Sequence, residues 1–192
     1  MHIADGILPV GVSIAADAVA LAGVYVSSRN LDAREIPRMG ISTAAMFAVS
    51  LIHLPLGGTS IHLGLFGLAG MILGARAFPA VVVNLLFQSL IFQHGGLLSV
   101  GVNSLTMGAG ALLSWLIWDF LPGNRAVTSF VCGFLGILLP AFLVSLVFLL
   151  LHYGKGMIFL MGLYVPAAVV EGMLSFFIYM YIHRVQPEVF AR

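Results

Sequence analysis

Seven apolar stretches follow one another along the chain, with few charged residues between them. They cover residues 9–28, 38–56, 60–76, 79–94, 101–120, 126–151 and 157–183. A helix that crosses a bilayer needs about 17–25 mainly apolar residues, and a helix buried inside a bundle needs fewer. Charged residues make up 8% of the chain, whereas soluble domains carry about 25%. We therefore predict an all-α fold, a polytopic transmembrane helical bundle of about seven helices that forms one integral membrane domain over residues 1–192.

The basic residues predict how this bundle is oriented. Seven spans place the two termini on opposite sides, and cytoplasmic loops carry an excess of Lys and Arg. With the N-terminus outside, Lys155 is the one basic residue that faces outward. The basic residues that then face inward are Arg29, Arg34, Arg38, Arg76, Arg125, Arg184 and Arg192. We predict an extracytoplasmic N-terminus and a cytoplasmic C-terminus.

Several classes of protein are disfavoured by simple features. A net charge of +1 argues against a nucleic-acid surface. The single Cys132 rules out a disulfide framework. No basic residue precedes Arg29, so the first apolar stretch lacks the basic region of a signal peptide and is expected to be retained. The phosphate-binding pattern Gly-x-x-x-x-Gly-Lys-Ser/Thr is absent, so we do not expect this chain to hydrolyse ATP itself.

The first two residues place several nitrogen donors on one short run of chain. Because histidine is too large for the enzyme that trims initiator methionine, the α-amine of Met1 is expected to remain. That amine, the backbone nitrogen of His2 and its ring Nδ1 can form fused chelate rings around Ni²⁺, Cu²⁺ or Co²⁺, which suit nitrogen donors. An ordinary polar histidine at a frayed terminus is the alternative that these residues leave open.

A fourth nitrogen is available at His62. We expect His62 on the first turn of a helix that begins near residue 60 and is capped by Thr59 or Ser60. The predicted orientation brings this turn, residues 1–2 and His94 to the same outer face, which strengthens the interpretation as a metal site.

Two acidic residues lie in the interior of apolar stretches, away from their ends, where charge is costly and therefore informative. Asp17 lies in the first stretch and Glu171 in the last. Each could line a water-filled path or pair with a donor on a neighbouring helix, such as Asn84, Gln88 or Asn103. The sequence assigns neither role.

Small residues recur at spacings that allow close helix packing. The pairs include Ala16 with Ala20, Gly70 with Gly74, and Gly133 with nearby Gly136. Small faces let helix backbones approach closely in a membrane. We expect them to pack helices of this chain together, and docking onto another membrane subunit is the second interpretation.

Three segments of the sequence are distinctive when taken together. They are Met1-His2-Ile3-Ala4-Asp5-Gly6, then Gly57-Gly58-Thr59-Ser60-Ile61-His62-Leu63 with Gly67-Leu68-Ala69-Gly70, then His94-Gly95-Gly96 continuing to Asn103-Ser104-Leu105-Thr106-Met107-Gly108. In this order they resemble the CbiM/NikM family, the substrate-binding membrane components of energy-coupling-factor importers for cobalt and nickel. The resemblance runs through most of the chain.

The resemblance implies a set of metal ligands. They are the amine of Met1, the backbone and ring nitrogens of His2, and the ring of His62. Residues expected close to these ligands are His53, Ser60, His94 and Asn103, and His53 is also a spare candidate ligand. The chain departs from the expected pattern at Phe66 and Gln93, which affects the lining of the pocket.

The resemblance also implies partners and a location. The partners would be separate polypeptides: a coupling transmembrane subunit, ATP-binding subunits and, as an option, a small accessory membrane subunit. The protein would lie in the plasma membrane of a prokaryote. Four nitrogen donors suit Co²⁺ and Ni²⁺ alike, so the transported ion is one or both of these.

Two other classes of function were weighed against the metal binder. A membrane electron-transfer protein would use histidines as haem ligands, but paired histidines at matching depth in facing spans are not evident. An intramembrane hydrolase would need a buried nucleophile and base, and Ser60 lies in no nucleophile motif.

Overall fold

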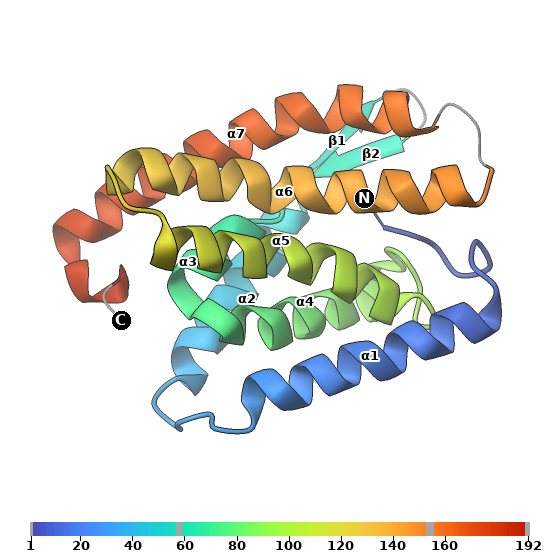
Figure 1. Cartoon of the computed structure of the whole chain (residues 1–192), viewed down its shortest axis with the longest axis horizontal. Coiled ribbons are helices and arrows are strands. Elements are labelled where there is room, and N and C mark those ends of the chain that lie inside the picture. The colour runs from blue at the N-terminus through green and yellow to red at the C-terminus, as the bar shows by residue number, and fades with distance from the viewer. Residues whose placement is uncertain (1, 57–58, 153–155, 191–192) are drawn as a thin grey trace.

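The computed structural model describes residues 2–56, 59–152 and 156–190. Within these ranges the chain folds into helices joined by short connections, with one small hairpin (Figure 1). The helices are α1 (Val10–Ser28), α2 (Ile36–Ser50), α3 (Phe66–Leu73), α4 (Ala77–Phe92), α5 (Val100–Phe120), α6 (Arg125–Leu150) and α7 (Gly156–Val185). Two short 3-10 segments, η1 (Gly74–Arg76) and η2 (Pro187–Phe190), complete the helical part. The prediction of an all-α membrane bundle is confirmed.

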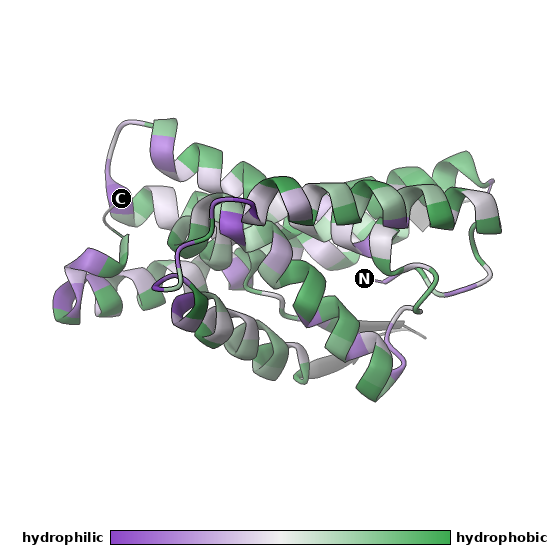
Figure 2. Ribbon diagram, turned by 90° about the horizontal axis from the view of Figure 1, so that it is seen from below, coloured by the Kyte–Doolittle hydropathy of each residue, from purple (hydrophilic) through white to green (hydrophobic). Residues whose placement is uncertain are grey.

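The outer surface of the bundle is apolar. In the described part of the chain, five helical segments are long and apolar enough to cross a membrane: Val10–Ser28, Phe66–Phe92, Val100–Phe120, Arg125–Leu150 and Phe159–Val185. Large apolar side chains such as Leu21, Phe120 and Leu150 are exposed. Soluble proteins rarely expose apolar surface of this extent to water. Hydrophobic residues line the helices, and hydrophilic ones gather mainly towards the ends of the bundle (Figure 2). This distribution fits a multi-pass membrane protein.

The helices run between the two ends of the bundle (Figure 1). One end carries the N-terminal segment, the hairpin and the α4–α5 connection. The α1–α2 and α5–α6 connections and the last turn of α7 lie at the other end. This second end holds the described arginines Arg29, Arg34, Arg38, Arg76, Arg125 and Arg184. The basic residues are therefore concentrated opposite the N-terminal segment.

Residues 53–62 do not follow the prediction. The sequence predicted helices over 38–56 and 60–76, but α2 ends at Ser50 and the chain then forms two antiparallel strands, β1 (His53–Leu56) and β2 (Thr59–His62). His53 pairs with His62, and Pro55 with Ser60. A helix through Pro55 would lose a hydrogen bond and clash with the preceding turn, so the helix ends before it. The predictions that His62 lies on a helical turn and that Thr59 or Ser60 caps it were wrong.

α3 is the centre of the bundle and packs by backbone contact. Seven of its eight residues are buried. A Cβ added at Gly67 would collide with the backbone of Cys132 in α6, and one added at Gly70 with Ala111 in α5. Between α6 and α7, a Cβ at Gly133 would meet the backbone of Glu171. These glycines therefore pack helices of this chain together, as expected for close approach in a membrane.

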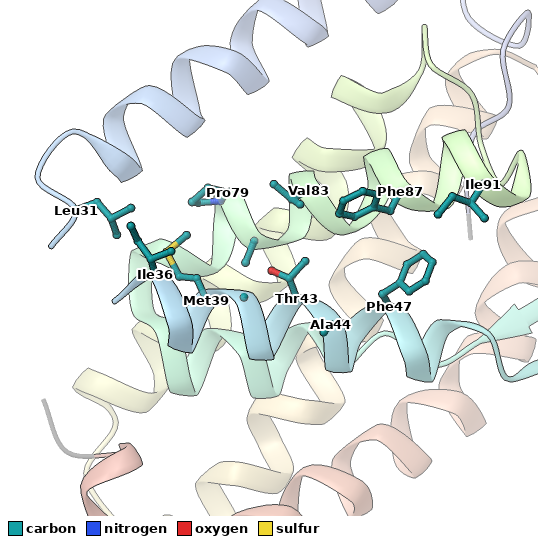
Figure 3. Close-up of a pocket in the computed structure, with 12 residues that line it drawn as sticks. Leu31, Ile36, Met39, Thr43, Ala44, Phe47, Pro79, Val83, Phe87 and Ile91 are labelled. Atoms are coloured by element: carbon teal, nitrogen blue, oxygen red, sulfur yellow. The ribbon is translucent and has the colours of Figure 1, made fainter. Parts of the chain in front are cut away.

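α2, like α1, has two buried residues. In α2 these are Met46 and Ser50. Between α2 and α4 runs a groove of about 540 Å³, with Phe47 and Phe87 along it (Figure 3). Its lining is apolar apart from Thr43. This side of the bundle therefore suits contact with the acyl chains of lipids.

Candidate metal centre

The N-terminal segment is held inside the bundle by α5. Ile3 is fully buried. Its N–H donates to Asn103 Oδ1 at 2.8 Å, and Asn103 Nδ2 donates back to the Ile3 carbonyl at 2.9 Å. The side-chain amide of Asn103 thus pairs with the backbone of Ile3 as a neighbouring strand would, which fixes the position of His2.

Asp5 fastens the same segment to the beginning of α5. Its carboxylate accepts the N–H groups of Ser99 at 2.8 Å and Leu98 at 3.3 Å. A Cβ added at Gly96 would collide with this carboxylate. Asp17 acts similarly from α1, since its Oδ1 accepts the Gly101 N–H at 2.7 Å. Both acids satisfy donors at the start of a helix, where no intrahelical acceptor is available and negative charge is favoured.

The two histidines predicted as ligands come together. His2 Nε2 lies 2.8 Å from His62 Nε2, and the two rings are 4.8 Å apart with 16° between their planes. His62 is 4% exposed. The nitrogen of His2 that faces His62 is therefore Nε2, whereas the chelate predicted from the sequence uses Nδ1.

The hydrogen bonds of His62 fix which of its nitrogens carries the proton. Its Nδ1 lies 3.1 Å from the Leu63 carbonyl oxygen, which can only accept. Nδ1 is therefore the donor, and Nε2 of the neutral ring keeps its lone pair. It follows that His2 Nε2 donates to His62 Nε2 across the 2.8 Å contact.

The His2 ring is kept uncharged by its surroundings. Burial lowers the pKa of His2 well below its usual value, and the nearby His62 and His94 lower that pKa further. At pH 7 the ring is therefore neutral, which is the state that binds a metal ion.

The 2.8 Å between the two Nε2 atoms is an ordinary hydrogen-bond distance. A cation held by both rings would take the place of the proton that His2 Nε2 donates. The ring of His2 would then bind through a nitrogen that has lost its proton.

His94 covers the His2 ring from the α4–α5 connection. The two rings are 6.1 Å apart and nearly parallel, with 13° between their planes. The chain turns towards His94 at Gln93, which has a left-handed φ of 55°. Glycine is the residue most often found at this position after a helix.

Some predicted residues lie outside the described part of the structure. These are Met1 and the side chains of His53 and Ser60. Among the described residues, no group of three or more His, Cys, Asp and Glu side chains could hold a metal ion. Donors beyond the two imidazoles would therefore be sought among main-chain nitrogens and Met1.

Comparison with known proteins decides the family. Residues 2–189 match the family model CbiM, described as the cobalt uptake substrate-specific transmembrane region. The chain belongs to the CbiM family.

Relatives of this CbiM-family chain cover its whole length. A Haemophilus influenzae protein named for metal transport is 30% identical over 202 residues, which span 100% of this chain and 98% of the relative. The cobalt transport protein CbiM of Desulforamulus reducens is 28% identical over 210 residues. This alignment spans 99% of this chain and 84% of the relative.

Solved structures show the same fold. A crystal structure of a transition metal transporter superposes with a TM-score of 0.83 at 24% identity, covering 96% of this chain and 93% of the other. A truncated transition metal transporter gives a TM-score of 0.80 at 24% identity. With the family known, the CbiM-family chain is a membrane component of metal transport, and the haem protein and the hydrolase are no longer supported.

Asn103 provides a first test of how the CbiM-family chain holds His2. Replacing Asn103 by Ala removes both hydrogen bonds to Ile3 and leaves a buried N–H and a buried carbonyl without partners, at a cost of about 1–3 kcal/mol for each. We expect the N-terminal segment to detach and metal affinity to fall. Amide hydrogen exchange at Ile3 and equilibrium metal binding measure the two effects. Thr106→Ala, one turn away in α5, is the control, and equal protection of Ile3 in both variants would contradict the assignment.

Proposed function

We propose that this chain binds Co²⁺ or Ni²⁺ at the end of the bundle that carries His2 and His62, and that it delivers the ion inward as the substrate-binding component of an energy-coupling-factor importer. The observation that supports this most is the 2.8 Å approach of His2 Nε2 to His62 Nε2, made by an N-terminal segment that is packed into a CbiM-family bundle.

We propose four nitrogen donors for the ion. They are the amine of Met1, the backbone nitrogen of His2, the His2 ring and the His62 ring. In the observed conformation His2 Nε2 faces His62 and donates to it, so a chelate through Nδ1 requires the ring to turn. The remaining residues would support the ligands: Asn103 through Ile3, and His94 by covering the His2 ring.

This donor set favours some ions over others. Ni²⁺ and Co²⁺ accept imidazole and amine nitrogens and tolerate planar arrangements. Zn²⁺ prefers a tetrahedral site, and Mg²⁺ and Ca²⁺ require oxygen ligands. The carboxylates of Asp5, Asp17 and Glu171 already accept backbone N–H groups.

Equilibrium binding to the purified chain tests the proposed function. We expect one Ni²⁺ or Co²⁺ per chain, bound more tightly than Zn²⁺ and much more tightly than Mg²⁺. The ion preference is measured by competition in equilibrium dialysis. Preferential binding of Zn²⁺ or Mg²⁺ would contradict the proposed nitrogen site.

The energy for transport would come from separate subunits. We propose a coupling membrane subunit and ATP-binding subunits as partners, because the chain contains no Gly-x-x-x-x-Gly-Lys-Ser/Thr sequence. Some relatives are longer: the fused nickel transport protein NikMN of Rhodobacter capsulatus is 35% identical over 136 residues, which are 39% of its length. Its name indicates that this module is joined to another in that protein.

The orientation of the bundle is open to a direct test. Since the arginines gather at one end, the positive-inside rule places that end in the cytoplasm and the metal site outside. In a Cys132→Ser background, we expect Leu97→Cys in the α4–α5 connection to react with an impermeant thiol reagent in intact cells. Ala33→Cys in the α1–α2 connection should react only after permeabilisation, and labelling of position 33 from outside would overturn the model of import.

A further inference from the structure

Glu171 is a buried carboxylate whose role the sequence left open. It lies in α7, it is 1% exposed, and it has no side-chain cation as a partner among the ion pairs of the described residues. Its oxygens instead accept backbone N–H groups 106 and 107 positions away in the chain. Oε1 accepts from Gly64, and the Leu65 N–H lies 3.1 Å from both oxygens.

These contacts lie directly beside His62. The Gly64 N–H that donates to Glu171 belongs to the same peptide group as the Leu63 carbonyl. That carbonyl accepts the Nδ1–H of His62 at 3.1 Å. A continuous path therefore runs from the Glu171 carboxylate through one peptide group to the His62 ring, and Nε2 at the far side of the ring faces His2.

The path has an electronic consequence. A peptide group whose N–H donates to a carboxylate becomes more polarised, so its carbonyl oxygen becomes a stronger acceptor, because hydrogen bonds in series strengthen one another. A stronger acceptor at Nδ1–H fixes the tautomer and raises the electron density at Nε2. Metal-binding histidines commonly gain the same effect from a carboxylate or carbonyl in direct contact with the ring.

The contacts of Glu171 also support an unfavourable backbone conformation close to His62. Leu65 has a left-handed φ of 52°, which is unfavourable for a residue with a Cβ. The bonds from Glu171 to Gly64 and Leu65 support this turn at the start of α3, where the helix also favours a negative charge.

We propose that Glu171 is a positioning residue for His62, acting through the Leu63–Gly64 peptide to hold the Nδ1–H tautomer and to present Nε2 as a metal ligand. This inference rests on the proposed function for its consequence in metal binding. It makes a separate statement about the His62 tautomer that needs no metal. No direct contact between Glu171 and the ion is implied.

The tautomer is measured by ¹⁵N NMR of histidine-labelled protein prepared without metal, with the His62 signal assigned from a His62→Gln variant. In the native chain we expect His62 Nδ1 to be protonated and His62 Nε2 to be unprotonated. Glu171→Gln keeps the size and one accepting oxygen but removes the charge, so we expect a mixture of tautomers. Ni²⁺ affinity should then fall by roughly 10–100-fold, the usual effect of changing a group that supports a metal ligand.

Asp17→Asn is the matched control. It removes the charge of another carboxylate that accepts a backbone N–H at the start of a helix. The donor to Asp17 is Gly101 in α5, whereas the donors to Glu171 lie beside His62. We expect the His62 tautomer to be unchanged in this variant. If Glu171 does no more than cap α3, Glu171→Gln will also leave the tautomer and the Ni²⁺ affinity unchanged, and the proposal is wrong.

Two outcomes separate this proposal from the proposed function. If the native chain binds no Ni²⁺ or Co²⁺ while His62 is held as the Nδ1–H tautomer only when Glu171 is present, the proposed function fails and the positioning role stands. The positioning role would be overturned if His62 in the native protein had an unprotonated Nδ1 and a protonated Nε2. That result needs no variant, so it remains decisive even if Glu171→Gln does not fold.

Discussion

His62→Ala is expected to reduce Ni²⁺ and Co²⁺ binding on the order of 100-fold or more, since changing a residue that merely supports a ligand already costs about 10–100-fold. The variant should still fold and insert, because the close backbone contacts of Gly67 and Gly70 with α6 and α5 do not involve the His62 ring. Isothermal titration calorimetry on the purified variant measures the affinity, and thermal unfolding without metal checks the fold.

Two other histidines serve as controls for this variant. His183 lies near the end of α7 and stacks on Tyr179 at 5.2 Å, at the opposite end of the bundle. We expect His183→Ala to bind metal normally. His53→Ala should have a smaller effect than His62→Ala. Equal losses at positions 53 and 62 would mean that the wrong histidine was selected or that both are ligands.

The second large effect is expected at the N-terminus. If Met1 binds through its amine, an Ala inserted between Met1 and His2 changes the chelate rings and moves the His2 ring relative to the amine. N-terminal acetylation removes the amine as a donor. We expect either change to abolish most Ni²⁺ and Co²⁺ binding, whereas a tag added after Arg192 should have little effect. Equilibrium dialysis of the three forms provides the comparison.

Retention of full affinity by the acetylated chain would remove Met1 from the set of ligands. Affinity should also decrease as the pH falls, because amine and imidazole donors must be free of protons to bind. For His2 this competition begins at lower pH than for an ordinary histidine, since burial lowers its pKa.

The sequence predicted the membrane bundle well, for identifiable reasons. Apolar stretches report directly on membrane helices, and the observed α1, α5 and α6 differ from the predicted stretches by one residue at most at either end. The glycine pattern likewise predicted close packing, which Gly70 and Gly133 show. That His2 and His62 lie close together was expected from the resemblance of their two motifs to one family. Their role as metal ligands stays a prediction.

The hairpin and the roles of the acids could not be read from the same signals. A run such as residues 53–62 is apolar enough for a helix, and Pro55 marks a break without saying that strands follow it. The partners of Asp5, Asp17 and Glu171 are backbone N–H groups 84 to 107 positions away in the chain. Every residue except proline has a backbone N–H. The identity of the partner residue therefore does not indicate that the contact exists.

The account depends most on the claim that one cation is held by both His2 and His62. X-ray absorption at the metal edge of the Ni²⁺- or Co²⁺-loaded chain tests this directly. The account predicts a nearest shell of nitrogen at about 2.0 Å, with outer-shell scattering from two imidazole rings. A shell of oxygen or sulfur, or scattering from one imidazole ring alone, would contradict it.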